Sequence, residues 1–206
     1  MSNTNAKNSV TMTRMIAFSG MFAAIAAVLM YFEIPLPFAP VFYKLDFSEV
    51  PVLIGTFCFG PVAGAVIEAL KILLKFVMKG TSTAGVGELA NFAVGCALVV
   101  PAGIVYKVMK SRIGALVGCI TGTAVMIVLG CLINAYVLLP FYANAFQMPI
   151  EALIEMGTAV NPAINSLMTF VLLAVAPFNL LKGVLVSIIT FLLYKRISRL
   201  VKGANN

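Results

Sequence analysis

The segment Ile113–Leu139 contains no charged residue, and four further apolar runs are spread along the chain. Folded as a helix with a rise of 1.5 Å per residue, such a segment can cross the hydrocarbon core of a bilayer, which is about 30 Å thick. Only 10% of the 206 residues are charged and 62% are hydrophobic, so a soluble domain could not cover its surface. The strands of outer-membrane barrels alternate polar and apolar residues, whereas these runs do not. The sequence therefore predicts an all-α integral membrane protein.

Six transmembrane helices are expected, in a single domain that covers residues 1–206. The stretch Val50–Met78 should form two short helices, because Gly60 and Pro61 are a turn signal in its middle. The last apolar region should form one helix with a bent lead-in and a break near Pro177. The expected spans are Met12–Phe32, the two helices within Val50–Met78, Leu89–Tyr106, Ile113–Leu139 and the end of Asn161–Tyr194. An outer loop at about 33–50 and a longer polar loop, Pro140–Asn161, connect some of these spans.

Basic residues at the ends of the apolar runs predict the orientation, because cytoplasmic loops are enriched in lysine and arginine. Six spans place three basic clusters on one side of the membrane. Both termini are then cytoplasmic, with tails at about 1–11 and about 195–206. Lys79 is the one charge that argues against this arrangement. The clusters are Lys7 with Arg14, then Lys107, Lys110 and Arg112, and finally Lys195, Arg196, Arg199 and Lys202.

Composition also argues against several kinds of function. The net charge of +7 is carried largely by the span ends, so no nucleic-acid partner is expected. Histidine is absent, which removes the commonest metal ligand and the usual general base. The four cysteines lie in apolar segments and form no CxxC pair. We therefore expect no metal site, no cofactor and no enzymatic activity.

Polar side chains within the spans are the candidate functional residues, because such groups are costly to place in lipid. Lys182 precedes Lys195 by thirteen residues, which puts it about 20 Å from the cytoplasmic boundary, with Asn179 about 24 Å away. These two residues are three apart and share a helix face. The same counting places Asn91 and Asn134 in the outer half of the membrane or at its outer edge. Three spans are thus expected to bring polar groups to a similar depth.

These groups offer hydrogen-bond donors and acceptors but no nucleophile or base. They suit the binding of a neutral ligand with an amide, imide or polyol edge. The first outer loop places Lys44, Asp46 and Phe47 above them. Interhelical hydrogen bonding is the alternative role, and it applies first to Asn91.

Two further patterns have both a structural and a functional explanation. Glu68, Lys71 and Lys75 form a stripe on one helix face, which suits either mutual pairing or the lining of an outer cavity. Small residues four apart in the first span let helices approach closely, either inside the chain or against a partner subunit. These small residues are Gly20, Ala23, Ala24 and Ala27.

Several motifs resemble those of a known family. They are "LDFSEVP", "FGPVAGAVIEALK", "ANF", "INAYVLLPFY" and "PFNLLKG". In a six-span chain of this length, they resemble the substrate-binding S component of an energy-coupling-factor (ECF) vitamin transporter, above all its riboflavin-specific type. The resemblance extends from about the first span to the C-terminus.

The resemblance implies roles for individual residues. Asn134, Asn179 and Lys182 match family positions that are expected to hydrogen-bond the vitamin, and Lys44–Ser48 matches the loop that is expected to cap it. The small-residue face of the first span is the kind that the family uses to meet its transmembrane coupling subunit. Gly20 departs from the alanines that are usual there.

The resemblance also implies a mechanism. An S component of the bacterial cytoplasmic membrane binds its vitamin from outside, joins a coupling subunit and two ATPases, and tips over to release the vitamin inside. The chain has no Gly-x-x-x-x-Gly-Lys-Ser/Thr motif, so its partners must hydrolyse ATP. High-affinity capture of riboflavin is the expected function. The alternatives are an S component for pantothenate, folate or a queuosine precursor, a membrane enzyme acting on lipid, and an assembly subunit without a ligand.

Overall fold

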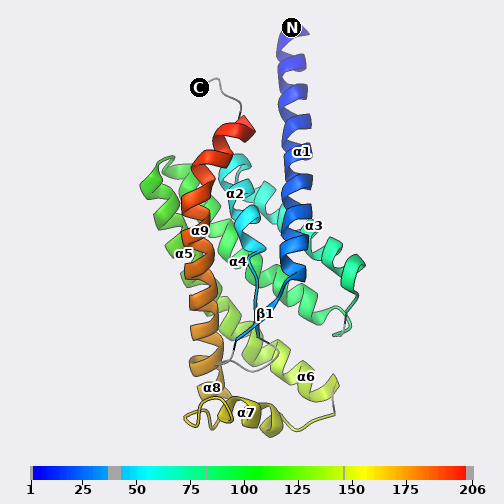
Figure 1. Cartoon of the computed structure of the whole chain (residues 1–206), viewed down its shortest axis with the longest axis vertical. Helices are drawn as coiled ribbons and strands as arrows, with labels where there is room; N and C mark the ends of the chain where they lie inside the picture. The colour runs from blue at the N-terminus through cyan, green and yellow to red at the C-terminus, as the bar shows by residue number, and fades with distance from the viewer. Residues whose placement is uncertain (1, 37–42, 82, 146, 203–206) are drawn as a thin grey trace.

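The computed structural model describes residues 2–36, 43–81, 83–145 and 147–202, and most of them are helical (Figure 1). The α-helices are α1 (Ser2–Tyr31), α2 (Glu49–Phe59), α3 (Pro61–Lys79), α4 (Val86–Val108), α5 (Arg112–Ile133), α6 (Leu139–Ala145), α7 (Ile150–Thr158), α8 (Leu167–Phe170) and α9 (Ala176–Lys202). The other elements are the π-helical segments η1 (Asn134–Leu138) and η2 (Val171–Val175) and the strands β1 (Ile34–Pro35) and β2 (Lys44–Leu45). The two strands pair antiparallel within the predicted capping loop.

Four helical stretches among the described residues are long and apolar enough to cross a membrane. They are Met12–Tyr31, Val86–Val108, Arg112–Ala145 and Leu167–Val201. In the last two, the helix continues through η1 and η2, where the hydrogen-bond pattern widens without ending the helix. η2 ends two residues before Pro177, so an irregularity does occur where the sequence predicted a break. The predicted all-α membrane architecture is confirmed.

The predicted division of Val50–Met78 is also confirmed. Gly60 adopts a φ of 99°, which glycine tolerates, and Pro61 begins α3 at a position where its missing N–H would have no partner. α2 has 11 residues, so its length of about 16 Å is too short to cross a 30 Å core alone. It is surrounded by protein instead, since Glu49–Phe57 is buried throughout and α2 contacts α1, α3, α4 and α9.

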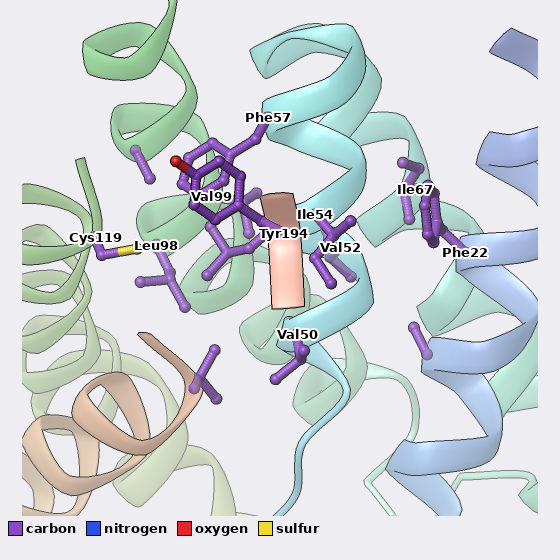
Figure 2. Close-up of a cluster of buried hydrophobic side chains, with 14 of the residues drawn as sticks. Phe22, Val50, Val52, Ile54, Phe57, Ile67, Leu98, Val99, Cys119 and Tyr194 are labelled. Atoms are coloured by element: carbon purple, nitrogen blue, oxygen red, sulfur yellow. The ribbon is translucent and has the colours of Figure 1, made fainter. Parts of the chain in front are cut away.

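The main hydrophobic cluster forms around α2. Figure 2 shows Val52, Ile54 and Phe57 of α2 between Phe22 of α1 and Tyr194 of α9. The Phe57 and Tyr194 rings meet edge to face, with centroids 5.6 Å apart. Because lipid tails are as apolar as these side chains, close van der Waals packing holds such a cluster together in a membrane.

α1 contacts the end of α9 at Arg14, twelve residues after α1 begins. Arg14 Nη2 donates a hydrogen bond to the Leu200 carbonyl over 3.3 Å, and both helix ends lie at the top of Figure 1. The helices α6, α7 and α8 lie at the opposite end. The residues predicted as tails continue these helices as far as the description reaches, because α1 starts at Ser2 and α9 runs to Lys202.

The prediction of a polar loop at Pro140–Asn161 is wrong. It contains most of α6 and all of α7, and only short segments of it are irregular. α7 was missed because Glu151 and Glu155 made the segment look polar, although Ile150, Leu153 and Ile154 recur at helical spacing.

The small residues of α1 divide between the inside and the outside of the chain. Ala23 and Ala27 are each 1% exposed, because α1 packs on α2 and α3. Gly20 and Ala24 are exposed. Internal packing therefore occupies Ala23 and Ala27, and only Gly20 and Ala24 of the predicted partner face are at the surface.

α4 and α5 approach each other closely at two glycines of α5. A Cβ on Gly118 would lie 2.7 Å from the Ala102 carbonyl oxygen, and one on Gly122 would lie 2.2 Å from the Leu98 carbonyl oxygen. Both obstacles are backbone atoms of α4, which cannot turn away as a side chain can. The two helices can take this separation only if neither position carries a side chain.

Gly122→Val is expected to lower the free energy of unfolding by about 1–3 kcal/mol, because the added methyl groups must push α4 and α5 apart. Denaturant titration of the purified protein in detergent measures this change. Ala124→Val is the matched control, since Ala124 is on an exposed part of the same helix. It should change stability by less than about 0.5 kcal/mol. A Gly122→Val variant as stable as the wild type would contradict the close approach.

Candidate ligand-binding site

A cavity of about 600 Å³ is lined by residues of α1, α3, α4, η1, α6, α7 and α9 and by the segment around β2. Six of the seven predicted binding residues line it: Lys44, Asp46, Asn91, Asn134, Asn179 and Lys182. Three of the expected spans thus contribute polar groups to one cavity, while their shared depth in a membrane stays a prediction. Whether these groups bind a ligand stays a prediction.

Asn134 is buried at the start of η1 and forms two hydrogen bonds. Its Nδ2 donates to the Gly130 carbonyl over 2.8 Å, and its Oδ1 accepts from the Tyr43 hydroxyl over 2.6 Å. Burial raises the pKa of Tyr43 well above its ordinary value, so the hydroxyl keeps its proton and remains a donor. Within the described residues, these bonds leave one amide hydrogen of Asn134 for a ligand.

Asn179 is buried on α9 and presents an acceptor. Its Nδ2 donates to the Val175 carbonyl over 3.0 Å, and a carbonyl can only accept, so this bond identifies the oxygen end of the amide. Asn179 Oδ1 accepts no hydrogen bond from the described part of the chain. The rings of Tyr43 and Phe178 line the same cavity, and their centroids lie 5.2 Å apart.

Lys182 forms an ion pair with Asp46, and this pair joins α9 to the segment between β2 and α2. Lys182 Nζ lies 2.9 Å from Asp46 Oδ2, while Asp46 Oδ1 accepts from the backbone N–H of Ser48 over 2.9 Å and from the Ser48 hydroxyl. Burial alone raises the pKa of Asp46, but the Lys182 and Lys71 ammonium groups outweigh it and hold this pKa well below its usual range. The pair therefore stays ionised, and Lys182 keeps further N–H donors for a ligand.

A second set of charges lies where the cavity meets the capping hairpin. Glu33 Oε2 accepts from Lys79 over 2.9 Å and from Lys44 over 3.2 Å, which links the end of α1 to α3 and β2. Partial burial by itself raises the pKa of Glu33, but the hydrogen bonds from Lys79 and Lys44 hold it below its usual value. The two lysine side chains are 39% and 44% exposed, so each pair contributes less than about 1 kcal/mol. Glu33, Lys44 and Lys79 form the polar rim of the cavity, and their ion pairs add little to the stability of the fold.

The charged stripe of α3 has two different roles. Lys71 Nζ lies 2.8 Å from Glu49 Oε1 and 2.6 Å from Glu68 Oε1, in a cluster whose side chains are at most 4% exposed. Lys75 lines the cavity and pairs with Glu88 of α4 over 3.4 Å. Glu68 and Lys71 therefore take part in internal ion pairing, whereas Lys75 lines the cavity.

The structure does not place Phe47 at the cavity. This ring is half-buried and packs against the main hydrophobic cluster, because the chain turns inward after Asp46 to begin α2. Three aromatic residues line the cavity instead, and no sequence pattern pointed to them: Tyr43, Tyr142 and Phe178. Tyr43 and Phe178 are next to the predicted residues Lys44 and Asn179 in the sequence, so adjacency was the signal that could have found these two.

The site combines three amides, an ammonium–carboxylate pair and aromatic rings around a volume typical of small-molecule pockets, about 300–1,000 Å³. Such a set can hold a flat molecule whose edge carries carbonyl and N–H groups. It provides recognition, with donors and acceptors fixed in advance by internal hydrogen bonds.

The chain belongs to the family of substrate-specific components of ECF transporters, whose model matches residues 14–194. It is similar to the riboflavin transporter RibU of Staphylococcus aureus, with 35% identity over 92% of each chain. It is also similar to the riboflavin transporter FmnP of Bacillus subtilis, with 34% identity over 84% of this chain and 86% of the relative. A solved S component of a bacterial ECF transporter superimposes with a TM-score of 0.71 at 32% identity, covering 93% of this chain and 99% of that one.

Membership in this family confirms the resemblance found in the sequence. It makes the chain a membrane transport component and not an enzyme, so the lipid-acting enzyme is set aside.

Proposed function

We propose that this chain captures riboflavin from outside the cell, as the vitamin-binding subunit of an ECF importer. The observation that carries the proposal is the meeting of Asn134, Asn179 and Lys182 in one cavity. The chain is also 34–35% identical to two proteins named as riboflavin transporters. Neither observation favours pantothenate, folate or a queuosine precursor.

The free polar groups complement the pyrimidine edge of riboflavin, which carries two carbonyls flanking one N–H. Asn179 Oδ1 can accept from the N–H, while Asn134 Nδ2 and Lys182 Nζ can donate to the carbonyls. Tyr43 and Phe178 offer apolar ring surfaces to the flat ring system. The hydroxylated side chain of the vitamin can then extend toward the polar rim.

Purified protein is expected to show flavin absorbance or to quench riboflavin fluorescence on titration. Asn134→Ala and Asn179→Ala should each weaken binding by about 1–3 kcal/mol, the scale for unpairing a buried polar contact, with folding kept. A colourless protein that leaves riboflavin fluorescence unchanged would refute the assignment, and titration with pantothenate or folate would then test the nearest alternatives. Unchanged dissociation constants in both variants would refute the site.

The proposal includes six crossings of the bacterial cytoplasmic membrane, with both termini in the cytoplasm. Four long apolar helices, the Arg14–Leu200 contact between the chain ends and the three basic clusters support it. α3 and α2, the latter sheltered by its neighbours, supply the remaining two crossings. Green fluorescent protein fused after Asn206 should fluoresce, and alkaline phosphatase fused there should be inactive. The reverse pattern would contradict this topology.

A transmembrane coupling subunit and two ATPases complete the proposed importer. The chain has no phosphate-binding loop motif, so ATP hydrolysis belongs to the partners. The exposed Gly20 and Ala24 of α1 offer a surface where another helix can approach closely. Copurification of the tagged chain with such subunits tests the assembly, and its failure in native membranes would refute it.

A further inference from the structure

Gly130 of α5 lies between Asn134 and Asn179, two of the three asparagines that line the cavity. Its carbonyl accepts the hydrogen bond from Asn134 Nδ2 over 2.8 Å. A Cβ on Gly130 would lie 2.8 Å from Asn179 Nδ2, 3.2 Å from Cγ and 3.4 Å from Oδ1. The Gly130 carbonyl therefore binds the Asn134 amide. The Asn179 amide packs against Gly130 where the side chain of any other residue would lie.

This contact is one of two close approaches between α5 and α9. In the other, a Cβ on Gly183 of α9 would lie 2.4 Å from Cγ2 and 2.8 Å from Oγ1 of Thr123 on α5. Each helix thus places a glycine against a polar side chain of its neighbour. Thr123 is not among the residues that line the cavity, whereas Asn179 is. Only the approach at Gly130 bears directly on the cavity.

We propose that Gly130 is a positioning residue. It places the amides of Asn134 and Asn179 for the ligand and does not need to contact the ligand itself. Its missing side chain lets the Asn179 amide bond Val175 through Nδ2 and leave Oδ1 for the ligand, while its carbonyl orients Asn134. The part that concerns the ligand rests on the proposed function. The part that concerns the placement of Asn179 stands on the geometry alone.

A methyl group at this position changes no ligand-binding side chain, but it displaces one. Carbon and nitrogen atoms that are not bonded pack at about 3.5 Å, so a separation of 2.8 Å forces the amide to turn or α9 to move. Asn179 is 4% exposed and has little room to turn without losing its bond to Val175. Either response misplaces the acceptor.

Riboflavin titrations of four proteins test the inference: wild type, Gly130→Ala, Asn179→Ala and the double variant. Gly130→Ala should weaken binding about tenfold, the size of one lost hydrogen bond. In the Asn179→Ala background the same change should weaken binding by less than about twofold, because the amide that the methyl group displaces is gone.

Thermal unfolding of the same four proteins without riboflavin gives a second readout. Gly130→Ala should lower the unfolding midpoint more in the wild type than in the Asn179→Ala background, since only the wild type has the crowded amide. Gly118→Ala is the matched control for helix packing, because its Cβ would press on the Ala102 carbonyl of α4 and neither residue lines the cavity. It should lower the midpoint while changing the dissociation constant by less than about twofold.

Three results would overturn the inference. They are an unchanged dissociation constant in Gly130→Ala, an equal loss of affinity in Gly118→Ala, and additive effects of Gly130→Ala and Asn179→Ala on unfolding. A wild type that fails to bind riboflavin would refute the proposed function instead. The unfolding measurements would then still decide whether Gly130 positions Asn179.

Discussion

Replacing Lys71 with methionine is expected to lower the free energy of unfolding by about 3–5 kcal/mol, the range for removing one partner of a buried ion pair. The Lys71 side chain is 1% exposed and stands between the carboxylates of Glu49 and Glu68, at 2.8 Å and 2.6 Å. Without the ammonium group, two carboxyl groups face each other in the interior with no opposite charge. Because Glu49 begins α2 and Glu68 belongs to α3, the loss should loosen the centre of the bundle. Denaturant titration in detergent measures it.

Two controls separate the charge from the change in shape. Lys79 is on the same helix as Lys71, but it is an exposed partner of Glu33. Lys79→Met should therefore lower the free energy of unfolding by only about 0–1 kcal/mol. Combining Lys71→Met with Glu49→Gln and Glu68→Gln leaves no charge in the cluster and should restore much of the lost stability. A Lys71→Met protein within about 1 kcal/mol of the wild type would show that the cluster is not a buried ion pair in the membrane-embedded protein.

Lys182→Met is expected to weaken riboflavin binding by about 2–5 kcal/mol, which is roughly thirtyfold to several thousandfold. The loss of one ligand contact would account for the lower end of this range. The structure raises the expected effect because Asp46 is 4% exposed and its Oδ2 loses the ammonium group at 2.9 Å. The unpaired carboxylate then stands beside the ligand. Quenching of riboflavin fluorescence gives both dissociation constants.

Adding Asp46→Asn to the Lys182 variant distinguishes the two contributions. The neutral amide removes the unpaired charge, so the double variant should bind more tightly than Lys182→Met alone while staying weaker than the wild type. A double variant equal to the wild type would mean that Lys182 makes no contact with riboflavin. A Lys182→Met protein with unchanged affinity would remove both residues from the site.

Local patterns were sufficient to predict much of the architecture. The uncharged run Ile113–Leu139 indicated a membrane helix, and Gly60 with Pro61 marked the division between α2 and α3. Counting 1.5 Å per residue from the basic span ends also placed Asn179 and Lys182 at a shared depth, where one cavity now contains them. Helix length, helix breaks and depth along a helix depend on residues that are close in the sequence, so they can be predicted from a single sequence.

The partners of the site residues depend on contacts between distant parts of the chain. Lys182 meets Asp46 from 136 residues away, and Tyr43 meets Asn134 from 91 residues away. The chemical type of these groups suggested that they form pairs, but it did not identify the partners. It also suggested that Phe47 lines the cavity, whereas Phe47 packs against the main hydrophobic cluster. Which side chain of the capping segment faces the cavity depends on the path of the backbone into α2, and that path is set by packing against α1, α3, α4 and α9.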